Sequence, residues 1–141
     1  MRLVIDANVL VTYFWPNSLL QQALFTDADF YSPEFALYEI KEHKQDLMRR
    51  THHTSASFQK MLEHMPLQIQ FISSREYSNY YKEMKTFILH LPPFEQNKIL
   101  KDIDYLTPAL KLNCPLWTND SLLKKQKGVQ ILTTKDIIPL L

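Results

Sequence analysis

Residues 3–8 read Leu-Val-Ile-Asp-Ala-Asn, and residues 115–120 read Pro-Leu-Trp-Thr-Asn-Asp. Each stretch contains a short apolar run followed by a carboxylate, Asp6 in the first stretch and Asp120 in the second. A brief apolar run is typical of a strand that is buried on both faces of a parallel sheet. Ligands bind at the carboxyl ends of such strands, where both aspartates would stand. Because two acids there lose solvation and repel each other, the pattern predicts a cation between them.

The rest of the chain alternates between predicted strands and predicted helices, with no repeat and no linker-like change in composition. Strands are predicted at 2–5, 30–31, 67–71, 116–117 and 129–132, and helices at 19–25, 34–50, 55–65, 74–89 and 94–112. Strands separated by helices indicate an α/β sandwich with a mainly parallel sheet. The length of 141 residues predicts a single domain over 1–141.

Composition excludes several classes of protein. The net charge of +1 produces no global field for nucleic acid or membrane, so any RNA-binding surface must be a local patch. No stretch is apolar for long enough to span a bilayer, and the N-terminus lacks the apolar core of a signal peptide. The single cysteine, Cys114, excludes an internal disulfide and fits a reducing compartment. We therefore expect a cytoplasmic protein without a membrane partner.

The only glycine of the chain is Gly128. A P-loop or a dinucleotide-binding turn needs several glycines so that the backbone can approach a phosphate closely. A nucleophile elbow of the Gly-x-Ser-x-Gly type is excluded for the same reason.

Two further acids are candidates for the same site as Asp6 and Asp120. Glu39 lies at the edge of the apolar stripe on the predicted helix 34–50, with Glu42 as its rival. Asp102 precedes an apolar run near a helix start, where a carboxylate serves as a helix cap or as a ligand. A set of carboxylate ligands suits Mg²⁺ or Mn²⁺, and the sequence has no Cys/His cluster for zinc.

These residues resemble the PIN-domain family over essentially the whole chain. The blocks that carry the resemblance are residues 4–10, 32–34 with 38–40, Asp102 ahead of 109–112, and 114–120. The resemblance implies a PIN-like three-layer α/β/α sandwich. It also implies that four acids bind one or two Mg²⁺ or Mn²⁺ ions, with two supporting polar residues; the acids are Asp6, Glu39, Asp102 and Asp120, and the supporting residues are Asn8 and Thr118.

The implied activity is a metal-dependent endoribonuclease that prefers single-stranded RNA. Many PIN-like proteins of this size are toxins of toxin–antitoxin pairs and form homodimers, so the resemblance also implies an antitoxin partner and a homodimer. The alternative is a PIN-like RNA- or protein-binding module that has lost the chemistry. A hydrolase that acts on DNA ends or structured flaps is a third hypothesis.

Pro108 departs from the family pattern, because an uninterrupted helix is expected after Asp102. Either the helix bends at Pro108, or it begins there with Thr107 as its cap. The second arrangement would leave Asp102 and Asp104 in a loop. Asp104 is therefore the substitute candidate for the third acid.

Three lysines follow Asp120 closely, namely Lys124, Lys125 and Lys127. Lysines beside an acidic site can hold the RNA backbone without reading its sequence. The alternative interpretation is an ordinary solvated surface. For the earlier basic group at Lys41, Lys44, Arg49 and Arg50, the solvated helix face is the better interpretation.

Overall fold

Five short strands form the centre of the structure, a computed structural model that describes residues 1–141. Their bounds are β1 Arg2–Ile5, β2 Asp29–Pro33, β3 Ile69–Ile72, β4 Leu116–Trp117 and β5 Ile131–Leu132. The strands lie in the order β3-β2-β1-β4-β5, and every pairing is parallel. This confirms the predicted α/β sandwich, with a sheet that is parallel throughout.

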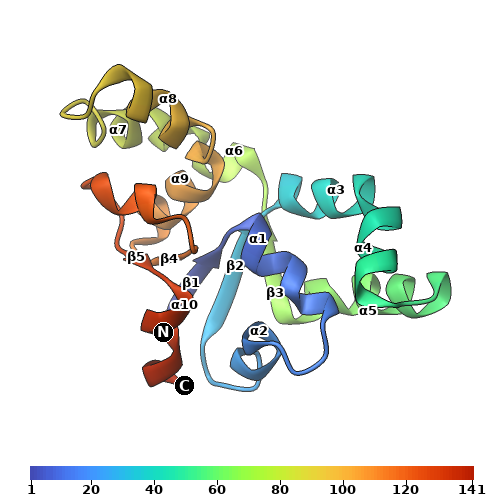
Figure 1. Ribbon diagram of the computed structural model, residues 1–141. Coiled ribbons are helices and arrows are strands. Elements are labelled where there is room, and N and C mark those ends of the chain that lie inside the picture. Colours follow the sequence, from blue (N-terminus) through green and yellow to red (C-terminus); the bar gives the residue numbers. More distant parts are fainter.

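Helices cover both faces of the sheet (Figure 1). The first group is α1 Ala7–Leu10, η1 Val11–Phe14, α2 Leu19–Ala23, α3 Glu34–Glu42, α4 Lys44–Thr51 and α5 Ser55–Gln68. The second is α6 Ser74–Tyr77, η2 Ser78–Tyr80, α7 Tyr81–Thr86, α8 Pro93–Leu100 and α9 Ile103–Leu112, and the C-terminal part adds η3 Ser121–Lys125, α10 Thr134–Ile137 and η4 Ile138–Leu140. Figure 1 shows α3, α4 and α5 on one side of the strands and α7, α8 and α9 on the other. No helix combines the length and the apolar character that crossing a membrane requires.

The central strand β1 explains why its sequence is apolar without alternation. Leu3, Val4 and Ile5 are almost completely buried, with at most 2% of each residue exposed. Val4 lies opposite Tyr31 of β2 on one side and opposite Leu116 of β4 on the other. Because helices cover both faces of the sheet, both sets of side chains on this strand enter the core.

Several helices differ in extent from the prediction. The predicted helix 34–50 is divided at His43 into α3 and α4, and the predicted helix 74–89 is divided into α6, η2 and α7. The predicted helix 55–65 instead continues through Pro66 to Gln68 as α5, so the following strand begins at Ile69. Proline is tolerated there because its missing N–H removes a single hydrogen bond close to the helix end.

The helix after Asp102 also passes through a proline. Helix α9 begins at Ile103, contains Pro108 and has Asp102 as its N-cap residue. The proline lacks only the N–H that would bond the carbonyl of Asp104. Asp102 therefore stands at the helix start and Asp104 in its first turn, and neither acid lies in a loop.

Candidate acidic site at the carboxyl end of the sheet

Asp6 is fixed at the point where β1 ends and α1 begins. Its Oδ1 accepts a hydrogen bond from the N–H of Val9 at 2.8 Å, so the carboxylate caps the short helix. The N–H of Asp6 donates to the carbonyl of Trp117 at 3.2 Å, which ties the end of β1 to β4. Only 8% of Asp6 is exposed. A buried carboxylate in this position is costly unless a positive charge compensates it.

Asp120 follows β4 and stands beside Asp6 through a shared partner, Thr118. The buried Thr118 side chain hydrogen-bonds Asp6, and its Oγ1 accepts from the N–H of Asp120 at 3.1 Å. Asp120 Oδ1 accepts from the N–H of Leu122 at 3.1 Å and so caps η3. Adjacent parallel strands thus place the two acids at one edge of the sheet, as the sequence predicted.

Asp102 approaches the same edge from the start of α9. Although it occupies the N-cap position, its side chain makes no capping hydrogen bond, so both carboxylate oxygens remain available. Burial raises the pKa of Asp102 to about 6, and the negative charges of Asp120 and Asp6 raise it further against the opposing effect of Lys101. The electrostatic coupling shows that these three aspartates are neighbours.

Burial also raises the pKa of Asp6, and the charge of Asp120 adds to this effect. Hydrogen bonds from Thr118 and from the N–H groups of Val9 and Asn8 oppose it. No lysine, arginine or histidine forms an ion pair with Asp6, Asp102 or Asp120. The cluster therefore carries negative charge that no side chain of the protein neutralises.

Asp104, the alternative third acid, has a different environment. Its Oδ1 accepts hydrogen bonds from the hydroxyl of Tyr77 at 3.2 Å and from the hydroxyl of Tyr81. Burial raises the pKa of Tyr81 to about 12, and the hydrogen bond and charge of Asp104 contribute to the rise. The structure thus brings Asp102, rather than Asp104, towards Asp6 and Asp120.

Glu39 lies at the flank of the cluster, on α3. Its side chain is 51% exposed, and its Oε2 lies 3.7 Å from Nε2 of His43. Glu39 and Asn8 line the same cavity of about 350 Å³, which is bordered by α1, α3 and α4. Glu42, its rival in the sequence, is exposed at the last position of α3 and does not line this cavity.

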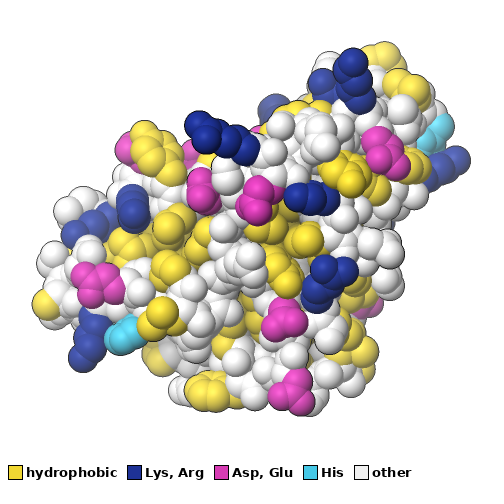
Figure 2. All heavy atoms as spheres, turned by 180° about the vertical axis from the view of Figure 1, so that it is seen from behind, with side chains coloured by type: hydrophobic (Ala, Val, Ile, Leu, Met, Phe, Trp, Pro, Cys, Tyr) yellow, Lys and Arg dark blue, Asp and Glu magenta, His cyan; other side chains and the backbone are white.

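The three lysines after Asp120 lie on η3 and the segment that follows it. Lys124 Nζ lies 3.7 Å from Oδ2 of Asp136, and Lys125 Nζ lies 2.9 Å from Oε1 of Glu95. Lys127 is exposed and forms no ion pair. Charges of both signs are scattered over the face in Figure 2, so this face presents no continuous basic surface.

Tyr105 belongs to the site although its sequence suggested only a core residue. It is 5% exposed, and no protein group hydrogen-bonds its hydroxyl. Burial raises the pKa of this hydroxyl, and so do four nearby negative charges, those of Asp6, Asp102, Glu39 and Asp104. The signal in the sequence was its position three residues after Asp102, which places both on one face of a helix.

The residues fit a hard divalent cation by chemistry and charge, in an open arrangement. No three Asp, Glu, His or Cys side chains approach one another closely enough to form a metal site by themselves. Mg²⁺ commonly binds through one or two carboxylates while it retains several waters and contacts substrate phosphates. Carboxylates and a threonine hydroxyl are the oxygen donors that such an ion prefers.

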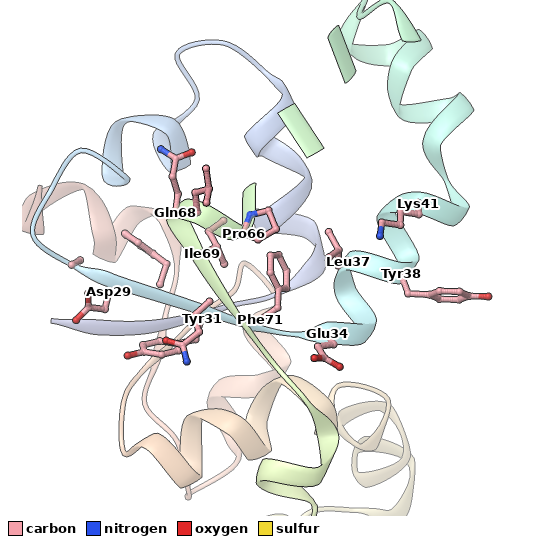
Figure 3. Close-up of a pocket in the computed structure, with 14 residues that line it drawn as sticks. Asp29, Tyr31, Glu34, Leu37, Tyr38, Lys41, Pro66, Gln68, Ile69 and Phe71 are labelled. Carbon is pink, nitrogen blue, oxygen red and sulfur yellow. The ribbon is translucent and has the colours of Figure 1, made fainter. Parts of the chain in front are cut away.

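A larger hollow, of about 830 Å³, lies away from this cluster between α3 and the edge strand β3. Figure 3 shows Leu37 and Phe71 among its apolar lining, with Lys41 and Glu34 at the α3 side. None of the aspartates Asp6, Asp102 and Asp120 lines it.

Comparison with known proteins gives a family model and a similar fold. The family model described as PIN domain matches residues 4–139. The solved structure of VapBC2 from Rickettsia felis, bound to a DNA fragment from their promoter, contains a chain with the same fold. The TM-score is 0.65 at 16% identity, and the match covers 94% of this chain and 98% of that chain. No curated protein sequence matches the chain.

Proposed function

The chain belongs to the PIN-domain family, and from this premise we propose that it is a metal-dependent endoribonuclease that cleaves single-stranded RNA. The observation that carries the proposal is the convergence of Asp6, Asp102 and Asp120 without a basic partner. Buried acids with raised pKa values in such a position are typical of functional sites. The ion we propose is Mg²⁺ or Mn²⁺, because the available donors are oxygen atoms.

In this proposal the carboxylates of Asp6, Asp102 and Asp120 hold the metal, and Glu39 completes the set from α3. Thr118 keeps Asp6 and Asp120 at a fixed separation because it hydrogen-bonds both. Asn8 supports the site from α1, where it lines a cavity with Glu39. When bound, the ion supplies polarisation of the scissile phosphate and a lower pKa for the attacking water.

The RNA backbone is proposed to contact Lys124, Lys125 and Lys127. Lys127 is free for this contact, whereas Lys124 and Lys125 must exchange Asp136 and Glu95 for phosphates. Both lysine side chains are about half exposed, at 50% and 53%. Exposed ion pairs contribute about 0–1 kcal/mol, so phosphate can displace them at little cost.

We also propose that the chain is the toxin of a toxin–antitoxin pair, with an antitoxin partner and a homodimeric state. Support comes from the PIN-domain family and from the fold shared with a chain of VapBC2. A small DNA-binding protein encoded directly upstream would favour this role, and its absence would favour a solitary nuclease.

One observation favours the alternative of an inactive RNA- or protein-binding module. No three potential ligand side chains form a closed metal site in the structure. A module of this kind would bind RNA without cleaving it in the presence of either Mg²⁺ or Mn²⁺.

The test is cleavage of single-stranded RNA with Mg²⁺ or Mn²⁺ by the parent protein, Asp6→Asn and Asp120→Asn. Removal of a ligand should lower the rate by about 100-fold or more, because metal catalysis contributes several kcal/mol. Asp27→Asn is the matched control, since Asp27 is an exposed acid without an ion pair. Activity that survives both site substitutions unchanged would rule out the metal mechanism.

A further inference from the structure

The ring of Tyr105 is held rigidly beside the acidic cluster. Helix α9 packs against β1 and β2, and Tyr105 lies on this helix three residues after Asp102. Phe35 of α3 contacts the ring edge to face, with the ring centroids 5.1 Å apart. Only 5% of Tyr105 is exposed, so the orientation of its hydroxyl is set by the surrounding elements.

The hydroxyl of Tyr105 is the polar atom that the fold leaves without a partner beside the acids. No protein group donates to it or accepts from it. By contrast, Tyr77 and Tyr81 both donate to Asp104. A buried hydroxyl without a partner lowers the stability of the folded protein, so such a group calls for a bound ligand or a functional role.

The surroundings define what kind of ligand this hydroxyl can reach. Four negative charges lie near it, those of Asp6, Asp102, Glu39 and Asp104, and together with burial they raise its pKa. The phenol therefore stays protonated and acts as a donor at neutral pH. Because the residue is 5% exposed, a nucleobase is too large to reach the hydroxyl, whereas a water molecule is small enough.

We propose that Tyr105 is a positioning residue whose hydroxyl donates a hydrogen bond to a water molecule held between it and the carboxylates of Asp6 and Asp102. Tyr105 keeps its proton and fixes the orientation of this water. The inference rests on the proposed nuclease function, in which a water molecule attacks the phosphate at this site. It predicts that the hydroxyl affects the chemical step and metal affinity more than RNA binding.

The experiment compares Tyr105→Phe with Tyr81→Phe, which removes a hydroxyl that has a protein partner. The measurements are the thermal midpoint, the dissociation constant for Mn²⁺, and kcat and KM for cleavage of single-stranded RNA. Tyr105→Phe should melt at or above the parent's midpoint, because it removes an unpaired polar group. It should lower kcat by about 10- to 100-fold with KM within about twofold, and weaken Mn²⁺ binding by about three- to tenfold.

Tyr81→Phe should show the opposite pattern, a lower thermal midpoint with kcat and Mn²⁺ affinity close to those of the parent. A crystal structure of the parent protein gives a readout that does not depend on activity. It should show an ordered water about 2.6–3.2 Å from the hydroxyl oxygen of Tyr105. A well-ordered site with no oxygen at this distance would overturn the proposal.

The outcomes separate this inference from the proposed function. If Asp6→Asn abolishes cleavage while Tyr105→Phe matches the parent in kcat and Mn²⁺ affinity, the role of Tyr105 is overturned and the nuclease stands. If the parent neither binds Mn²⁺ nor cleaves RNA, the proposed function fails and the inference fails with it. If the parent binds Mn²⁺ but cleaves no RNA tested, the Mn²⁺ affinity of Tyr105→Phe decides.

Discussion

Asp102 and Asp104 are separated by one residue on the chain, yet their carboxylates have different neighbours. Asp102 makes no capping hydrogen bond and is coupled to the charges of Asp6 and Asp120. Asp104 accepts hydrogen bonds from Tyr77 and Tyr81. One acid therefore carries uncompensated charge, whereas the other holds α6 and α7 against α9.

This difference predicts opposite effects for two alanine substitutions. Asp104→Ala should lower the free energy of unfolding by about 1–3 kcal/mol, since it leaves two tyrosine hydroxyls without their acceptor. It should leave Mn²⁺ affinity almost unchanged. Asp102→Ala should weaken Mn²⁺ binding without a comparable loss of stability. Calorimetric titration with Mn²⁺ and urea unfolding measure both quantities, and weaker Mn²⁺ binding by Asp104→Ala than by Asp102→Ala would contradict the assignment.

The raised pKa of Asp102 predicts a pH-dependent stability for the metal-free protein. The group titrates at about 6 in the folded state against an ordinary value of 3.8. Between these values the folded state binds more protons than the unfolded state, so stability falls as pH rises from about 4 to about 6. The raised pKa of Asp6 acts in the same direction.

Asp102→Asn removes this effect and should be more stable than the parent at pH 7 in the presence of EDTA. The gain should be about 1–2 kcal/mol, after a reduction for the partial exposure of the side chain. Near pH 4 the two proteins should have similar stability. Thermal unfolding at both pH values checks this, and equal midpoints at pH 7 would contradict it.

A divalent cation should stabilise the parent protein at neutral pH, because it binds the folded acidic cluster and relieves its repulsion. We expect Mn²⁺ to raise the thermal midpoint at pH 7 and EDTA to reverse the change. The shift should shrink at pH 5, where protons compete for Asp102 and Asp6. Thermal shift assays with Asp6→Asn and Asp120→Asn provide the control, since neither variant should respond. A response of the same size in both variants would place the ion elsewhere.

Thr118 should be needed for the geometry that joins Asp6 and Asp120. Thr118→Val keeps the size of the side chain but removes the hydroxyl that bonds both acids. We expect weaker Mn²⁺ binding, at least about tenfold slower cleavage and a loss of about 1–2 kcal/mol of stability. Thr118→Ser retains the hydroxyl and should behave much more like the parent in the same assays. Equal activity of the valine and serine variants would show that the hydroxyl has no role.

The single glycine is constrained by packing. A Cβ at Gly128 would lie 2.4 Å from Cδ2 and 2.8 Å from Cγ of the Phe87 ring. Gly128→Ala should therefore lower the free energy of unfolding by about 1–3 kcal/mol, because the ring must move. Urea unfolding measures the loss. The double variant with Phe87→Leu should recover part of it, and an unchanged midpoint for Gly128→Ala would refute the steric explanation.

The sequence was sufficient to predict the main strands and the two acids at their carboxyl ends. Apolar runs such as residues 3–5 have the pattern of strands buried on both faces, and parallel strands end at a common edge. For this reason Asp6 and Asp120 could be placed together before any contact was known. The order of the elements also indicated the α/β sandwich, since each helix separates successive strands.

Helix limits were harder to predict because they depend on tertiary packing. Pro66 did not end its helix, and α9 passes through Pro108, although both residues are local breakers. The cost of one missing hydrogen bond is smaller than the gain from burying the apolar face of the helix, so packing decided both cases.

The sequence by itself determined which residues could form strands and which acids would stand at the sheet edge. Only the tertiary structure decided how the remaining polar groups are used: Asp104 is bonded by tyrosines, Asp102 faces the cluster, and Tyr105 is buried beside it without a partner. The physical reason is that periodicity and end position are local properties of a chain. Hydrogen-bond partners and uncompensated charge depend on which elements pack across the fold.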